Sequence, residues 1–214
     1  MGEVRRRRHA APEGGTVLIR PYRESDRDAV GDICVRTADA GGDSSHLYAD
    51  LELMPSIFAW PYTALEPDLA FVADDGDRAV GYVLGVADTP TFVERFRTDW
   101  LPKVTDRFPL VDPPVTPTDQ MVWLLHHPER MIVPALADYP AHLHIDLLPA
   151  HQRSGHGRGL MEALLNALKD KGVPAVHLGM LTVNTPARAF YDRLGFHEID
   201  VPARGPLTYL GLHL

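Results

Sequence analysis

The 214-residue sequence has almost no cysteine and no long apolar segment. Cys34 is the only cysteine, so no disulfide can form within the chain, and a reducing compartment is the simplest expectation. It follows Ile33 on an apolar helix face, which predicts a buried structural thiol. No apolar run approaches the roughly 18 residues of a membrane span, and the basic N-terminus lacks the apolar core of a signal peptide. We therefore expect a cytoplasmic protein with no membrane partner.

Positive charge is also in short supply. The sequence has 21 Lys and Arg against 29 Asp and Glu, a formal net charge of −8. Nucleic-acid-binding surfaces are usually basic, so this balance argues against a nucleic-acid partner. The exception is the arginine run at 5–8, which we interpret as part of a disordered basic arm over residues 1–15. Residues 16–214 then suffice for a single domain with a substantial core.

The apolar pattern predicts a mixed α/β domain. A helix is expected to begin at Ser25 or Asp26, and Gly41 to Ser45 interrupt the pattern after it. Further helices are expected at 156–171 and 186–194. Strands are predicted at residues 16–20, 69–73, 79–86, 141–148, 175–181, 196–199 and 208–212, the second and third of them forming a hairpin.

Proline-rich sequence occupies residues 89–140, between the predicted hairpin and the strand at 141–148. Nine prolines occur there, with short helices expected around 91–106 and 118–126. Long irregular stretches in compact domains are usually functional, so we interpret this stretch as an insertion that shapes a pocket or an oligomer contact. Trp60, Trp100 and Trp123 could stack a sugar or aromatic acceptor, although core or dimer contacts are the commoner role.

A glycine-rich loop, Gln152 to Leu160, joins a predicted strand to a predicted helix. Its backbone N–H groups, freed of side-chain bulk by Gly155 and Gly157, can point at a phosphate, and the helix dipole favours an anion there. Arg153 and Arg158 can add charge-assisted hydrogen bonds. The loop therefore predicts a pyrophosphate site.

Two common nucleotide motifs do not fit this loop. A dinucleotide fingerprint needs a third glycine where the chain has Leu160, and no acidic ribose reader follows in the right context. A P-loop needs Gly-Lys-Ser or Gly-Lys-Thr, which the chain lacks.

The loop instead resembles that of the GCN5-related N-acetyltransferase (GNAT) superfamily, in which Gln/Arg-x-x-Gly-x-Gly/Ala holds the coenzyme A pyrophosphate. A second block of that family's pattern follows after one strand. The matching residues are Gln152, Gly155, Gly157, Asn184, Ala187, Phe190, Tyr191, Leu194, Gly195 and Phe196. The resemblance implies a central mixed, mostly antiparallel twisted sheet flanked by helices, and an acetyl-CoA-dependent transfer of an acetyl group directly to an amine.

The resemblance also implies roles for individual residues. The backbone of Ile145 and Leu147 would pair with the pantetheine arm, and Asn184 would reach it. Ala187 and Phe190 would pack along the cofactor. The pyrophosphate would be held at Gln152, Arg153, Ser154, Gly155, His156, Gly157 and Arg158.

Acetyl transfer needs a neutral amine and a proton for the leaving thiolate. Tyr191 matches the family's usual acid, which would sit near the sulfur. The glutamate that many relatives carry five residues before Asn184 is Gly179 here. Asp146 is the preferred substitute base, since an apolar strand would raise its pKa. A structural carboxylate is the alternative. His144 shares the face of Asp146 by strand alternation and could be a base or a relay, and His177 is a further candidate.

A narrower resemblance covers roughly residues 17–214. His144-Ile145-Asp146, Trp100-Leu101-Pro102 and Ile19-Arg20-Pro21-Tyr22 are similar to the acetyltransferase-like domain at the C-terminal end of animal O-GlcNAcases and to its stand-alone bacterial relatives. The animal domains depart from the glycine-loop pattern, whereas this chain keeps it.

Other interpretations remain open at this point. His142, His144, His151 and His156 could suggest a metal site, but no cysteine or second tight pair completes one, so no metal is expected. The missing glutamate favours a catalytically silent acetyl-CoA sensor or scaffold as the alternative function. The acceptor would be a small-molecule or peptide amine. Dimers are common among similar proteins, so a homodimer is left open.

Overall fold

The computed structural model describes residues 16–202 and 205–214. The basic arm predicted at residues 1–15 lies outside the described residues. No helix in the described part of the chain is long and apolar enough to span a membrane.

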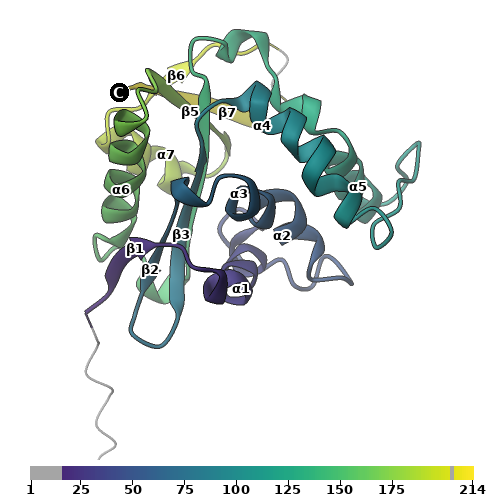
Figure 1. Cartoon of the computed structure of the whole chain (residues 1–214), viewed down its shortest axis with the longest axis horizontal. Helices are drawn as coiled ribbons and strands as arrows, with labels where there is room; N and C mark the ends of the chain where they lie inside the picture. The colour runs from purple at the N-terminus through teal and green to yellow at the C-terminus, as the bar shows by residue number, and fades with distance from the viewer. Residues whose placement is uncertain (1–15, 203–204) are drawn as a thin grey trace, which may run out of the picture.

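Seven strands form one sheet in the order β1-β2-β3-β4-β5-β7-β6 (Figure 1). The only parallel neighbours among the described strands are β4 and β5; all other pairs are antiparallel. The mixed, mostly antiparallel sheet that was predicted is therefore confirmed. The strands are β1 Leu18–Pro21, β2 Ala70–Asp74, β3 Ala79–Val86, β4 Ala141–Leu147, β5 Ala175–Leu181, β6 His197–Ile199 and β7 Leu207–His213.

The sheet opens between β4 and β5. These strands pair only at Ala141–Val176 and His142–His177. Beyond them β4 continues to pair with β3 as far as Leu147, and β5 pairs with β7 along its whole length. The edge of β4 that faces β5 thus keeps unpaired backbone groups beyond His142. Such groups need a partner, and an extended ligand can supply it.

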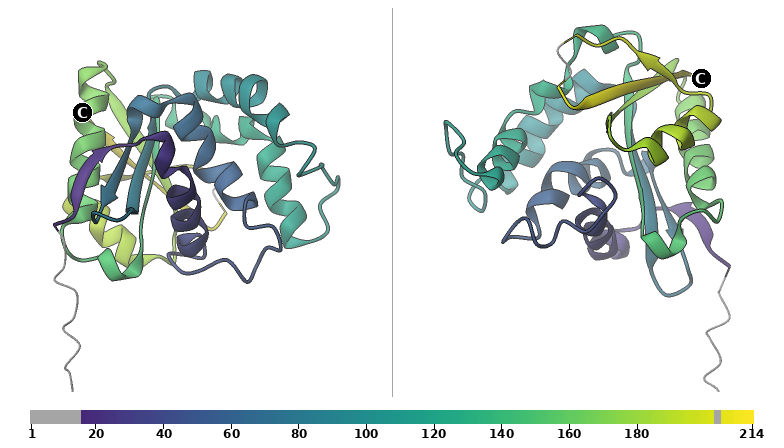
Figure 2. Two further views of the ribbon diagram at one scale, coloured as in Figure 1. Left: turned by 60° about the horizontal axis from the view of Figure 1, so that its bottom comes forward. Right: turned by 180° about the vertical axis from the view of Figure 1, so that it is seen from behind.

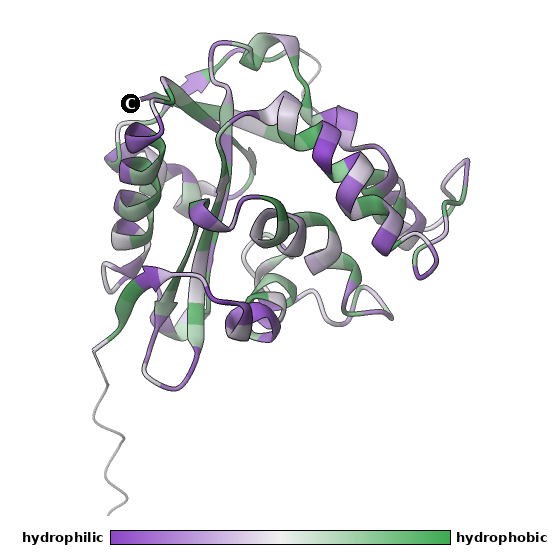
Figure 3. Cartoon of the chain, viewed as in Figure 1, coloured by the Kyte–Doolittle hydropathy of each residue, from purple (hydrophilic) through white to green (hydrophobic). Residues whose placement is uncertain are grey.

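Helices cover both faces of the sheet (Figures 1 and 2). One face carries α6, His156–Asp170, and α7, Thr185–Arg193. The apolar side of α6 faces the sheet (Figure 3), where Leu160, Leu164 and Leu168 are buried. The other face carries α1 Arg27–Thr37, α2 Leu53–Phe58, α3 Trp60–Leu65 and α4 Thr89–Arg95, and α5 Pro117–His126 packs on α2 outside them.

Two apolar clusters fill the space on either side. Tyr82 and Leu84 belong to the cluster under α1–α3, and Val83 to the cluster under α6, because side chains alternate across β3. Cys34 lies fully inside the first cluster, as predicted for a structural thiol.

The predicted strands and the helices at 156–171 and 186–194 are confirmed to within a few residues. The stretch around 91–106, where short helices were expected, is helical as far as Lys103. It is divided into α4, a π-helical turn at Phe96–Trp100 and a 3-10 turn at Leu101–Lys103. Pro102 is the physical reason, because it has no N–H to continue the helix. Other 3-10 turns are Glu24–Asp26, Pro67–Leu69, Pro128–Met131, Pro134–Leu136 and Pro149–His151.

Two differences from the sequence predictions concern the helices on the face of the sheet that carries α1, α2 and α3. Helices α2 and α3 were not predicted, because they are buried almost all round and therefore lack the one-sided periodicity of a surface helix. Asp26 precedes α1 but makes no side-chain cap for it. Its carboxylate instead accepts from both terminal nitrogens of Arg20, at 2.7 and 2.8 Å.

Candidate functional site

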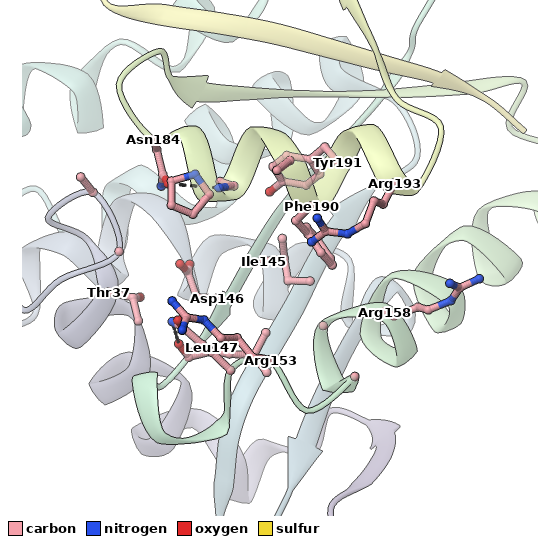
Figure 4. Close-up of a pocket in the computed structure, with 18 residues that line it drawn as sticks. Thr37, Ile145, Asp146, Leu147, Arg153, Arg158, Asn184, Phe190, Tyr191 and Arg193 are labelled. Atoms are coloured by element: carbon pink, nitrogen blue, oxygen red, sulfur yellow. Dashed lines mark hydrogen bonds between the residues drawn. The ribbon is translucent and has the colours of Figure 1, made fainter.

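A pocket of about 770 Å³ lies where β4 and β5 separate. Figure 4 shows residues of α7 along one side and Thr37, Asp146 and Arg153 on the other. The lining brings together the end of α1, β4, the glycine loop and α7. Its members are Thr37, Ala40, Gly41, Ile145, Asp146, Leu147, Gln152, Arg153, Gly155, Gly157, Arg158, Asn184, Pro186, Ala187, Ala189, Phe190, Tyr191 and Arg193.

The glycine loop presents unused backbone donors to this pocket. Gly155 caps α6 with φ +86°, and Arg153 has φ +61°. Left-handed backbone is strained for Arg153 but free of strain for Gly155. Gln152 Nε2 donates to Leu147 O at 3.0 Å, which ties the loop to β4. Within the described chain, no N–H group of residues 153–158 has a hydrogen-bond partner. This arrangement fits an anion.

Helix α7 is fixed against the loop by its own cap. Asn184 Oδ1 accepts from Ala187 N at 3.2 Å, which leaves the Asn184 amide NH₂ for a ligand. Phe190 packs against Gly157, where an added Cβ would lie 3.4 Å from the ring. Tyr191 is buried in the cluster under α6 but still lines the pocket. Cap and packing therefore set the distance between α7 and the loop.

Asp146 is the carboxylate of the pocket. It accepts a hydrogen bond from Tyr82 Oη at 2.7 Å. Burial raises its pKa to about 6, against the smaller opposing effect of the Tyr82 and Thr37 hydroxyls. A carboxyl with this pKa is ionised at neutral pH yet basic enough to take a proton. Burial and the charge of Asp146 raise the pKa of Tyr191, so its phenol stays protonated.

His144 lies at the end of a hydrogen-bond chain. Thr89 Oγ1 donates to Pro140 O at 2.7 Å, so it must accept from His142 Nδ1 at 2.9 Å. His142 Nε2 is then the acceptor of the Tyr62 hydroxyl at 3.0 Å. Tyr62 Oη in turn accepts from His144 Nε2 at 3.0 Å. The chain therefore leaves His144 Nδ1 as a bare acceptor.

Both imidazoles in this chain are neutral. Burial lowers the pKa of His144 to about 4, and burial with the neighbouring His177 lowers that of His142 well below its usual value. His142 and His144 lie opposite Val86 and Leu84 of β3, on the same face as Asp146 opposite Tyr82. The strand alternation expected from the sequence is confirmed. Both Nε2 atoms are hydrogen-bonded to the Tyr62 hydroxyl, which links the two imidazoles.

Gly179 occupies the position where many relatives carry a glutamate, and Tyr209 covers it. The two residues face each other across β5 and β7. A Cβ built on Gly179 would lie 3.2 Å from Cε1 of the Tyr209 ring. A glutamate here would need that ring to move.

The structure brings most of the predicted site residues to one pocket. Ser154, His156, His144 and His177 are not part of its lining, although the first two belong to the loop beside it. His177 Nδ1 bonds to Tyr139 O at 2.7 Å under the 128–140 segment. Sequence reasoning missed Thr37, Ala40, Gly41, Pro186, Ala189 and Arg193. Their only sequence signal was position, namely the helix end before Gly41 and the spacing within α7.

The pocket's construction matches a known family model. The model described as the acetyltransferase (GNAT) family matches residues 115–196, which include β4, the glycine loop and all of α7. A crystal structure described as SsHAT is 61% identical, with a TM-score of 0.90, over 92% of this chain and 98% of that one. The chain belongs to the GNAT acetyltransferase family.

Two further proteins are similar to this chain. The protein O-GlcNAcase of Rattus norvegicus is 25% identical over 88% of this chain, which spans only 21% of that protein. The fold is also shared by yncA, a putative acetyltransferase from Salmonella typhimurium solved with acetyl-CoA, at 16% identity and a TM-score of 0.54. That similarity covers 92% of this GNAT chain and 94% of yncA.

Proposed function

We propose that this protein binds acetyl-CoA and transfers its acetyl group directly to an amine. The observation that supports this most strongly is the pocket itself. Unpaired N–H groups at residues 153–158, the open edge of β4, a carboxyl with a pKa near neutrality, Asp146, and a protonated phenol, Tyr191, all meet there.

The residues present fit acetyl-CoA. The donors of residues 153–158, with Arg153 and Arg158, would hold its pyrophosphate. The backbone of Ile145 and Leu147 would pair with the pantetheine arm as an added strand, and the Asn184 amide would donate to it. Ala187 and Phe190 would pack along the same arm. Acetyl-CoA supplies a thioester carbonyl that a neutral amine can attack.

Two residues would move the protons. Asp146 would take one from the acceptor amine, because its carboxylate is ionised near neutral pH and lines the pocket. Tyr191 would give one to the sulfur as the carbon–sulfur bond breaks, and would regain it from solvent. His144 would accept a hydrogen bond from the amine at Nδ1, on the same face as Asp146. No step in this scheme needs a metal.

One observation favours a second function. Gly179 leaves the chain without the glutamate that many relatives use, so a catalytically silent acetyl-CoA sensor or scaffold is the alternative. Both functions share the loop and β4, and they differ only at Asp146, Tyr191 and His144.

Isothermal titration with acetyl-CoA, combined with a free-thiol assay over small and peptide amines, separates the two functions. Binding with amine-dependent thiol release supports the transferase. Binding without release for any amine supports the sensor. Absence of binding would contradict both.

A further inference from the structure

Arg130 is a half-buried cation on the side of the sheet that carries α1, α2 and α3. It belongs to the Pro128–Met131 turn, within the segment interpreted from the sequence as an insertion. Its guanidinium carbon lies 5.8 Å from the centroid of the Phe58 ring of α2. Burial lowers the pKa of Arg130, which shows how far the group is removed from water.

No acidic side chain compensates this charge. Across residues 16–202 and 205–214, Arg130 makes no salt bridge. Its Nε donates to Leu124 O at 3.3 Å, and its two terminal nitrogens have no partner in the same ranges. Those nitrogens are not enclosed either, since no fully buried side-chain nitrogen in the described residues lacks a partner. Both therefore keep some exposure to solvent. A desolvated cation without a carboxylate is costly, and an anion that binds there would offset the cost.

The neighbours of Arg130 lie beside the proposed reaction centre. Its charge lowers the pKa of His144 on β4 and opposes the rise in the pKa of Tyr209 on β7. His144 lies two positions before Asp146 on the same face, and Tyr209 covers Gly179. Phe58, beside the Arg130 guanidinium, also contacts the His144 ring, with 5.8 Å between the ring centroids. Arg130 thus lies close to β4, which borders the opening in the sheet, and its charge also acts on β7.

We propose that Arg130 binds a carboxylate carried by the acceptor, so that the acceptor is an amine with an acidic group, such as an amino acid or the C-terminal residue of a short peptide. The guanidinium matches a planar carboxylate with two parallel hydrogen bonds. The Phe58 ring lies beside the guanidinium and also contacts His144. This inference rests on the proposed transferase function and adds the substrate class.

The test compares acceptors that differ only in the anion. Lysine is compared with cadaverine, the twenty amino acids with their amides, and phosphoethanolamine with ethanolamine, by thiol release from acetyl-CoA. We expect carboxylate acceptors to have kcat/KM about 10- to 100-fold above their neutral partners. A preference for phosphoethanolamine over all carboxylates would assign the site to phosphate and overturn the carboxylate proposal. No preference within any pair, including no turnover of any amine, would overturn it as well.

Two variants of Arg130 and one control variant test whether Arg130 causes the preference for carboxylate acceptors. Arg130→Gln should abolish the preference for carboxylates while acetyl-CoA affinity, measured by titration, stays unchanged, and Arg130→Lys should retain part of the preference. Arg97→Gln is the matched control, because the Arg97 guanidinium in the adjacent π-helical turn is already paired with Glu129. A preference that survives in Arg130→Gln contradicts the proposal.

These outcomes separate the two proposals. Loss of acetyl-CoA binding in the unaltered protein contradicts the proposed function. Normal acetyl-CoA binding and amine turnover without discrimination between paired acceptors contradict only the role of Arg130.

Discussion

At the scale of single residues, the site depends on placing ionisable groups in apolar surroundings. Asp146 and Tyr191 both lie against buried apolar clusters, and burial shifts both pKa values upward. The same shift makes Asp146 a useful base and keeps the Tyr191 phenol protonated at neutral pH. It also implies that Asp146 costs stability, and that cost can be measured.

Replacing Asp146 with Asn should lower activity and raise stability. The folded pKa of about 6 exceeds the ordinary value of 3.8, so the folded state holds the proton more tightly. The stability of the unaltered protein therefore falls as pH rises from about 4 to about 6. Asp146→Asn should be more stable by up to about 3 kcal/mol at pH 8, with the difference vanishing below pH 4. Denaturant titrations at both pH values check this, and equal stability at pH 8 would contradict it.

Replacing Tyr191 with Phe should separate catalysis from binding. The ring packs in the cluster under α6, and Phe keeps that contact. We expect kcat to fall about 100-fold or more, with acetyl-CoA affinity unchanged. Steady-state kinetics and titration measure both quantities. Turnover left intact would remove Tyr191 from the mechanism.

At the scale of elements, the site is assembled by the ends of helices and by one relay between α3 and β4. The N-terminus of α6 and the cap of α7 face each other across the pocket. Tyr62 of α3 joins His142 and His144 of β4. Each of these two arrangements can be tested with one variant and one matched control variant.

Strain at the start of α6 should weaken acetyl-CoA binding specifically. Gly155 and Gly172 bracket the helix with φ +86° and +73°, and a Cβ at either would meet nothing within 4 Å. Gly155→Val and Gly172→Val should each cost about 1 to 3 kcal/mol of folding free energy. Only Gly155→Val should weaken acetyl-CoA binding, by about tenfold or more, because only its loop holds the pyrophosphate donors. Equal affinities in the two variants would contradict the site.

Removing the Tyr62 hydroxyl should allow His144 to adopt either tautomer. Tyr62→Phe leaves Nε2 of both histidines without its partner, at a cost of about 1 to 3 kcal/mol. We expect kcat/KM to fall about tenfold and its pH profile to change, since Nδ1 of His144 is no longer held as an acceptor. Tyr139→Phe is the control, because Tyr139 Oη also contacts His197, at 2.7 Å, but at the far edge of the sheet. A normal pH profile in Tyr62→Phe would exclude the relay.

At the scale of the whole molecule, the opening between β4 and β5 divides the sheet into two parts. β4 is held by β3 on one side only beyond His142, so a ligand that pairs with its free edge should stabilise the fold. We therefore expect acetyl-CoA to stabilise the fold of this GNAT protein as well as to serve as its substrate.

Acetyl-CoA at 100 times its Kd should stabilise the protein by about 2.7 kcal/mol and raise Tm by about 5 to 10 °C. Hydrogen exchange should slow at Ile145 and Leu147 on β4, with little change along β7, which is fully paired with β5. Thermal unfolding and exchange measurements test this, and slower exchange spread evenly over all strands would contradict the added-strand geometry.

Much of the fold was readable because its elements carry local signals. Gly155 and Gly157, the apolar stripe of α6 and the Asn184 block all lie within one continuous stretch, so the resemblance to the GNAT family pattern could be seen in the sequence. The part of the molecule around α2, α3 and Arg130 could not be predicted from the sequence. Helices α2 and α3 are buried all round and have no periodicity, and Arg130 carries no sequence sign that its charge is left unpaired.

The sequence by itself determined the strand order along the chain, the glycine loop and the placing of His144 and Asp146 on one face, because these follow from spacing along a strand or helix. Only the tertiary structure decided which groups meet across elements, including Tyr62 between two histidines, Tyr209 over Gly179 and Arg130 beside Phe58. The reason is physical: backbone periodicity fixes the direction of neighbouring side chains, whereas contacts between distant segments depend on how the helices pack on the sheet.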